Sequence, residues 1–209
     1  MLKISQKKID EINEQINAQI EDLKINGPLK QTPQKIFDTA NGFYEAALRC
    51  MKSEPNSDGT ERSPMIPAIV NFAFACELYI KSRLKQIGKA SKGHELKKLY
   101  NKLDDAFKNY LSLEYQEALE TDQASFEKDI ETFSNAFVSW RYVYEGSSGD
   151  SIILQKLIIL TCALYRVQKK LNAEWEVQKD MDVRLDFPDS NILFLVINSK
   201  GFFQAKIIN

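Results

Sequence analysis

The chain of 209 residues contains one histidine, His94, and this scarcity restricts the chemistry that it can perform. Neither HExxH nor ExxH occurs and no Cys/His cluster is present, so we expect no metal site and no cofactor. A Walker loop, a GxGxxG fingerprint and a GxSxG elbow are also absent, which removes the common signatures of phosphate loops, dinucleotide binding and α/β hydrolases. Catalysis of the Ser-His or Cys-His kind would have to recruit His94. Because His94 stands at an expected helix start, a capping or packing role is favoured for it.

Cysteine is scarce as well. The three cysteines are odd in number, widely separated and surrounded by apolar residues: Cys50, Cys76 and Cys162. This argues against a disulfide framework or a zinc site and favours a reducing compartment. The first eight residues are too polar for a signal peptide. The most apolar run, 152–165, is shorter than the about 20 residues that span a bilayer. We therefore expect a cytoplasmic protein that does not contact membrane.

Glycine and proline are few, with eight Gly and six Pro, while 44% of the residues are hydrophobic. This composition is typical of a folded helical protein, and apolar residues recur at helical spacing along most of the chain. We predict an all-α protein, an up-and-down helical bundle over residues 33–178, preceded by an amphipathic helix within 1–30. The expected helices cover about 3–25, 33–51, 63–87, 93–103, 113–119, 123–145 and 151–177.

The last twenty residues have a different pattern. Two apolar runs, 192–197 and 202–208, flank Asn198-Ser199-Lys200-Gly201, which predicts a β-hairpin within residues 190–209. An isolated pair of strands is marginal in water, so we expect this hairpin to pack on the helices or on another chain.

Charge is nearly balanced overall, at −1, but it is unevenly distributed. Residues 81–98 hold seven Lys/Arg against one acid, Glu95, and residues 104–131 hold nine acids against two lysines. The two stretches predict partner surfaces of opposite sign, although ordinary solvated helix faces produce the same pattern. The candidates are Lys85, Lys89 and Lys97 for nucleic acid, and Glu117, Glu120 and Asp122 for a protein partner.

One arginine stands among aromatic residues. A helical wheel of 123–145 places Arg141 at the edge of the apolar face, with Glu145 one turn further on. The same construction places Glu77 at the edge of the 73–84 apolar face, so we expect a cross-helix pair of Glu77 and Arg141. The pair is either a structural ion pair or part of a polar cleft that also holds Asn41, Lys81 and Tyr144. The apolar face itself consists of Phe126, Ile130, Phe133, Phe137 and Tyr144.

Three stretches of the sequence together resemble uncharacterised bacterial members of the HEPN superfamily. They are Phe74-Ala75-Cys76-Glu77-Leu78-Tyr79-Ile80-Lys81-Ser82-Arg83-Leu84, Lys92-Gly93-His94-Glu95-Leu96-Lys97-Lys98-Leu99-Tyr100 and Phe137-Val138-Ser139-Trp140-Arg141-Tyr142-Val143-Tyr144-Glu145. The resemblance covers residues 33–175. It implies a bundle of four or five helices that forms a homodimer and serves in a toxin–antitoxin, phage-defence or RNA-processing system.

Active members of that superfamily are metal-independent endoribonucleases whose motif is an Arg followed four to six residues later by a His. Arg141 matches the Arg, but Gly146, Ser147 and Ser148 stand near the place of the His. An arginine in the place of Arg141 stabilises the negative charge of a phosphate, but it stays protonated and so does not act as a general acid or base. The resemblance therefore implies a non-catalytic protein that acts by binding a protein partner or nucleic acid.

Two alternatives remain open. One is an endoribonuclease with a dimer-composite site, in which Arg141 works with Glu145 or Tyr144. The other is an immunity protein or antitoxin whose acidic 104–131 stretch covers a basic toxin surface.

Overall fold

A computed structural model describes residues 7–8, 10–11, 13–18, 31–51, 54–55, 61–62, 64–134, 136–141, 152–176, 192–197 and 203–208. The chain divides into two compact units, Met1–Gln31 and Thr32–Asn209. In the first unit, residues 7–8, 10–11 and 13–18 are helical. The helix expected over 3–25 has apolar residues at steps of three and four, of which Ile16 is described, while Ile9, Ile12, Ile20 and Leu23 lie outside the described residues.

The second unit begins with two helices that pack along each other, α2 (Pro33–Cys50) and α3 (Met65–Gln86). Thr32 caps α2, since its hydroxyl accepts a hydrogen bond from the Lys35 amide at 3.2 Å, and Pro33 occupies the first helical turn. Gly88 follows α3 with φ +70°, a conformation that favours glycine, and this ends the helix. Between them lie two short paired strands, β1 (Glu54–Pro55) and β2 (Glu61–Arg62), where the sequence predicts only a loop.

Four shorter helices follow: α4 (Leu96–Asn101), α5 (Asp105–Leu119), α6 (Gln123–Thr132) and α7 (Ala136–Arg141). The prediction of one helix over 123–145 is wrong, because α6 ends at Thr132 and α7 starts afresh at Ala136. Ser134 lies in this break and hydrogen-bonds to the first turn of α4. Its carbonyl accepts the Leu96 amide at 2.8 Å and its hydroxyl accepts the Lys97 amide at 3.3 Å, so the break caps the first turn of α4.

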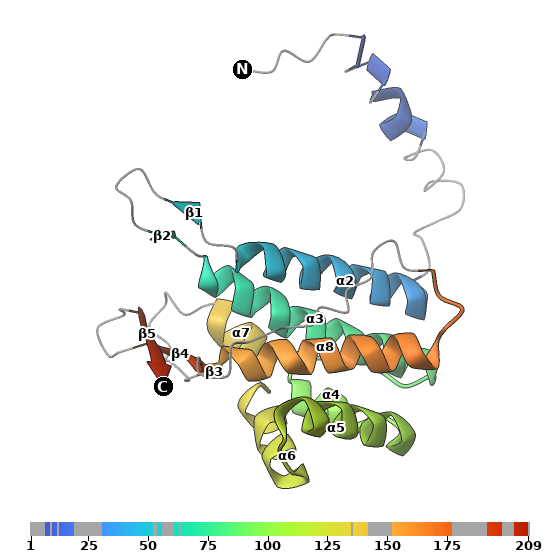
Figure 1. Ribbon diagram of the computed structural model, residues 1–209. Coiled ribbons are helices and arrows are strands. Elements are labelled where there is room, and N and C mark those ends of the chain that lie inside the picture. The colour runs from blue at the N-terminus through green and yellow to red at the C-terminus, as the bar shows by residue number, and fades with distance from the viewer. Residues whose placement is uncertain are drawn as a thin grey trace. The chain divides into compact units, whose positions relative to one another are not determined.

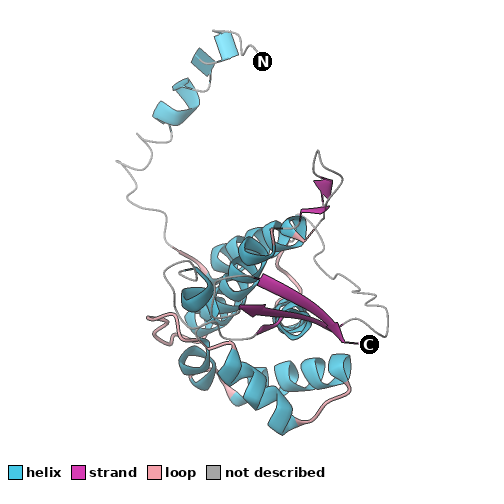
Figure 2. Cartoon of the chain, turned by 90° about the vertical axis from the view of Figure 1, so that its left-hand side faces the viewer, coloured by secondary structure: helices cyan, strands magenta, loops and turns pink. Residues whose placement is uncertain are grey.

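The last long helix, α8 (Leu154–Leu171), contacts α3 and α5. Figure 1 shows α2, α3 and α8 lying alongside one another, with α4, α5 and α6 beyond α8. The strand β3 (Ile152–Ile153) directly precedes α8 and pairs with β4 (Ile192–Ile197), which pairs antiparallel with β5 (Phe203–Ile208). The sequence pattern predicts helix at 152–153, where the structure has the strand β3. Figure 2 shows the three strands as a small sheet, and β4 contacts α8.

The core lies between α2, α3 and α8, and aromatic rings fill it. Phe37 stacks on Tyr165 with ring centroids 5.8 Å apart, and Tyr79 from α3 meets both rings. Burial of such large rings supplies most of the stabilisation of a helical core. The described part of the chain is predominantly helical, which confirms the predicted all-α class.

The helix α3 is the centre of this arrangement, since it contacts α2, α4, α7 and α8. Among the residues that the structure describes, α3 is the one helix long and apolar enough to cross a membrane, and over half of its most apolar window is buried in the fold.

Candidate functional site

A buried carboxylate on α3 is the starting point of the candidate site. The side chain of Glu77 is 1% exposed. Lys81 follows one helical turn later, and its Nζ donates to Glu77 Oε1 at 2.7 Å. A carboxylate held this deep is costly unless other groups neutralise it and donate hydrogen bonds to it.

His94 provides the second partner of Glu77. Its Nδ1 lies 3.0 Å from Oε1 and 3.2 Å from Oε2 of Glu77, although the His94 side chain is 57% exposed. On its other side the imidazole lies near the ring of Phe137 in α7, with centroids 5.8 Å apart. Of the capping or packing role expected for His94, capping is not observed, because Glu95 occupies the N-cap position of α4, whereas the imidazole does lie against the Phe137 ring.

The short segment between α3 and α4 places His94 over Glu77. Gly93 has φ +94°, a conformation that favours glycine, and the chain bends just before the histidine. The segment then enters α4, where Leu96 and Leu99 are buried and Ser134 holds the first turn. The position of His94 therefore depends on a glycine turn, two core leucines and a cap from a distant serine.

Of the predicted polar cleft, the structure brings together Glu77 and Lys81. Asn41 instead accepts a hydrogen bond from the Tyr79 hydroxyl at 2.7 Å. Arg141 is the last residue of α7, which packs against α3, while its side chain lies outside the described residues. Tyr144 and Glu145 lie outside them as well. The pairing of Glu77 with Arg141 stays a prediction.

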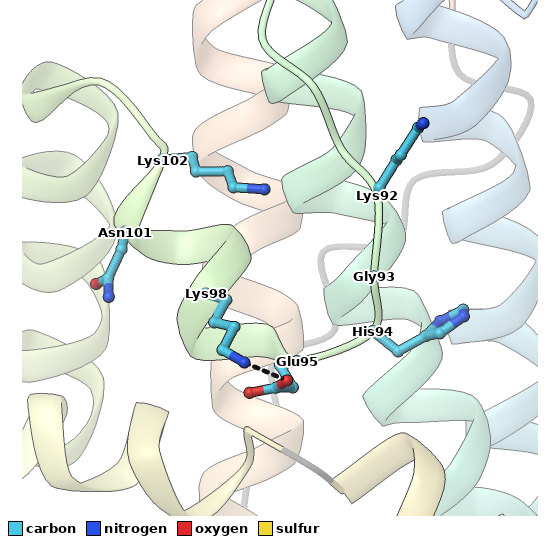
Figure 3. Close-up of a pocket in the computed structure, with 7 residues that line it drawn as sticks. All are labelled: Lys92, Gly93, His94, Glu95, Lys98, Asn101 and Lys102. Atoms are coloured by element: carbon cyan, nitrogen blue, oxygen red, sulfur yellow. Dashed lines mark hydrogen bonds and ion pairs between the residues drawn. The ribbon is translucent and has the colours of Figure 1, made fainter.

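A basic pocket of about 280 Å³ adjoins this segment. Figure 3 shows that Lys98 and Lys102 lie on one side of the segment, whereas the side chains of Lys92 and His94 extend to the other. Lys98 is paired with Glu95 at 2.6 Å. The pocket is lined by Lys92, Gly93, His94, Glu95, Lys98, Asn101 and Lys102.

The lysines predicted for nucleic acid differ in their surroundings. Lys97 forms an ion pair with Glu131, so part of its charge is neutralised. Lys85 is exposed, and the ammonium of Lys89 donates to the Lys102 carbonyl at 2.6 Å. Among the described residues, no carboxylate pairs with four lysines of this region: Lys85, Lys89, Lys92 and Lys102.

The acidic candidates are all exposed, but two of them have structural positions. Glu120 ends α5 in the left-handed conformation, with φ 49°. Asp122 caps α6, and the hydrogen bond from the Ser125 amide lowers the pKa of its carboxyl. Glu117 is exposed on α5. Ordinary helix architecture therefore explains part of the acidic pattern.

The described residues include no group of three or more His, Cys, Asp or Glu side chains arranged to hold a metal ion. The Glu77–His94 pair is the arrangement that sequence reasoning missed. The residues are 17 positions apart and meet through a loop, so no periodic pattern links them. The available signal was a glutamate on a core helix face and a histidine after a turn glycine.

Comparisons of the chain with protein-family models, with curated protein sequences and with solved structures gave no match.

Proposed function

We propose that this chain is a helical protein of the HEPN type, with a C-terminal β-hairpin, that binds RNA in the cytoplasm as part of a bacterial conflict or defence system. The observation that carries the binding proposal is the set of lysines around the 88–102 segment that lack a carboxylate partner among the described residues: Lys85, Lys89, Lys92 and Lys102. The HEPN type, the homodimer and the defence setting rest on the sequence resemblance.

The lysines favour a polyanion because no carboxylate among the described residues balances their positive charge. Lys81, Lys97 and Lys98 are each paired with a glutamate and contribute little net field. The four unbalanced lysines attract phosphates and release the counterions that surround them, which is the main source of affinity for nucleic acid. A pocket of about 280 Å³ lined by residues of the 92–102 segment gives a phosphate group room beside Lys102.

A protein partner is the competing occupant. The acidic stretch offers it Glu117 and Glu120, which are exposed, but Glu120 and Asp122 also shape the ends of α5 and α6. The unbalanced basic charge is therefore the better-supported contact surface. If the protein is an immunity protein or antitoxin, affinity for its partner will depend on Glu117 and not on Lys92.

Fluorescence polarisation with a labelled single-stranded RNA tests the proposal. We expect Lys92→Glu combined with Lys102→Glu to weaken binding at least tenfold, because each substitution replaces attraction to a phosphate by repulsion. Lys128→Glu is the matched control, since Lys128 is exposed on α6 within the acidic stretch. RNA affinity unaffected by the double variant, or equally affected by the control, contradicts the proposal.

A further inference from the structure

The helix α6 presents two carboxylates to the basic helix α4. Glu127 and Glu131 are four residues apart on α6 and therefore lie on the same face of it. Glu131 forms an ion pair with the ammonium of Lys97 on α4. Burial raises the pKa of Tyr100 on α4, and the negative charge of Glu127 raises this pKa further. Both acids of α6 thus act on α4, whose Lys97 belongs to the basic stretch 81–98.

Other contacts than the ion pair hold α6 in this position. The Ser134 hydroxyl, just after α6, accepts a hydrogen bond from the Lys97 amide at 3.3 Å. On another side of α6, Asp129 accepts from the Lys156 ammonium of α8 at 2.9 Å. The helix is therefore attached to both α4 and α8 by groups other than Glu131. These attachments keep the Glu131 carboxylate beside Lys97 even when the ion pair itself is broken.

The ion pair is open to solvent and has space beside it. The Lys97 side chain is 43% exposed and the Glu131 side chain is 59% exposed, and an ion pair at such exposure contributes little to stability. A phosphate that reaches Lys97 can therefore displace Glu131 at small cost. A pocket of about 260 Å³ lies at this junction of α4 and α6, lined by Lys97, Tyr100, Asn101, Glu127 and Ile130.

Negative charge is in excess at this junction. Glu127 accepts a hydrogen bond from the amide of Gln123 at 2.8 Å, and no basic side chain among the described residues pairs with it. Two carboxylates therefore face one ammonium, that of Lys97. Their combined charge repels a polyanion that approaches α4, in addition to neutralising the lysine.

We propose that α6 is an intramolecular competitor of RNA, in which Glu131 occupies the ammonium of Lys97 until a phosphate of the RNA displaces it. This inference rests on the proposed RNA binding and concerns its regulation. RNA binding breaks one weak ion pair and forms one contact between lysine and phosphate. The affinity of the protein for RNA is then lower than its lysines alone would give, and the charge on α6 sets how much lower.

Fluorescence polarisation of the full chain with a labelled single-stranded RNA, at several salt concentrations, tests the competition. Glu131→Gln keeps the size of the side chain and removes its charge. We expect this variant to bind RNA about two- to fivefold more tightly, since an exposed ion pair no longer has to break. The slope of the logarithm of affinity against the logarithm of salt concentration should steepen by about 0.7, because Lys97 neutralises one more phosphate.

A double-mutant cycle with Lys97→Ala shows whether the gain passes through Lys97. In the Lys97→Ala background, Glu131→Gln should have little effect on RNA affinity, because no ammonium is left to release. Both side chains are substantially exposed, so these variants keep the fold. Glu117→Gln is the matched control: it changes the net charge equally, at an exposed position of α5, and should leave RNA affinity unchanged.

The outcomes distinguish this inference from the proposed function. If Glu131→Gln raises affinity no more than Glu117→Gln does, or raises it equally with and without Lys97, α6 is not a competitor and the RNA-binding proposal stands. If neither the wild type nor any variant has affinity for RNA, the proposed function fails and the inference fails with it. A gain in affinity that requires Lys97 supports both.

Discussion

At the scale of single residues, two acidic side chains that differ in burial, Glu77 and Asp104, have different roles. Glu77 is buried and receives hydrogen bonds from Lys81 and His94. Asp104 is partly exposed, yet it combines two tasks: it caps α5 at the Phe107 amide and accepts from Arg83 Nε at 2.8 Å. Its contacts serve stability, whereas those of Glu77 also direct an exposed imidazole.

Asp104→Ala is expected to lower the free energy of unfolding by about 1–2 kcal/mol. The hydrogen bond from Arg83 is the main reason that the pKa of Asp104 lies below its ordinary value of 3.8. A carboxyl with a lowered pKa stabilises the folded state above its unfolded-state pKa, and this contribution is lost as the pH falls through the folded-state pKa. Urea unfolding of both proteins at neutral pH and well below pH 3.8 measures it.

Asp105→Ala is the matched control for Asp104, because the Asp105 side chain is 97% exposed and lies next to it in sequence. We expect this control to change stability much less at either pH. A difference between wild type and Asp104→Ala that persists below the lowered pKa would contradict the assigned role of the carboxylate.

At the scale of elements, the short helices depend on neighbours rather than on their own sequence. The six-residue helices α4 and α7 are too short to be stable alone. Ser134 caps the first from outside, and α7 packs on α3. A buried cluster also links three helices, since Asp129 of α6 accepts from Tyr115 of α5 and from Lys156 of α8.

Lys156→Met is expected to destabilise the protein by about 2 kcal/mol, because it leaves the mostly buried Asp129 without its counter-charge. In the double variant with Asp129→Leu the charge is gone, so we expect the two losses to be clearly non-additive. Chemical denaturation of the two single variants and the double variant gives the coupling. Additive losses would show that the pair contributes nothing as a pair.

The sequence predicts α2 and α3 well, but it predicts only residues 113–119 of α5 and places the junctions between helices poorly. Helical spacing predicts helices at 33–51 and 63–87, within two residues of the observed bounds of α2 and α3. The break between α6 and α7 escapes prediction because Phe133 and Phe137 continue the helical spacing across it. The reason for the break, Ser134 bonding to α4, is a tertiary contact that local sequence does not encode.

The candidate site was predictable to the same limited extent. The buried Glu77 with Lys81 one turn later follows from the helical pattern of α3. The hydrogen bond between Glu77 and His94 does not follow from that pattern. The position of His94 depends on the direction that the chain takes after Gly88 and through Gly93. The acidic and basic stretches were visible in sequence, but the pairing of Lys97 with Glu131 depends on how α4 meets α6.

For the molecule as a whole, local ion pairs cancel much of its charge. A chain with 28 basic and 29 acidic side chains has almost no net field, so any attraction for a polyanion must come from an uneven surface. The lysines without a carboxylate partner among the described residues provide such a region next to the Glu77–His94 pair.

The salt dependence of RNA binding tests the central claim most directly. For wild-type protein, the logarithm of the association constant should fall linearly with the logarithm of salt concentration, with a slope of about −0.7 for each phosphate neutralised on a single strand. Lys92→Ala with Lys102→Ala should make that slope shallower by about 1.4, whereas Lys128→Ala should leave it unchanged. A wild-type slope near zero, or one that the double variant does not alter, would contradict the account.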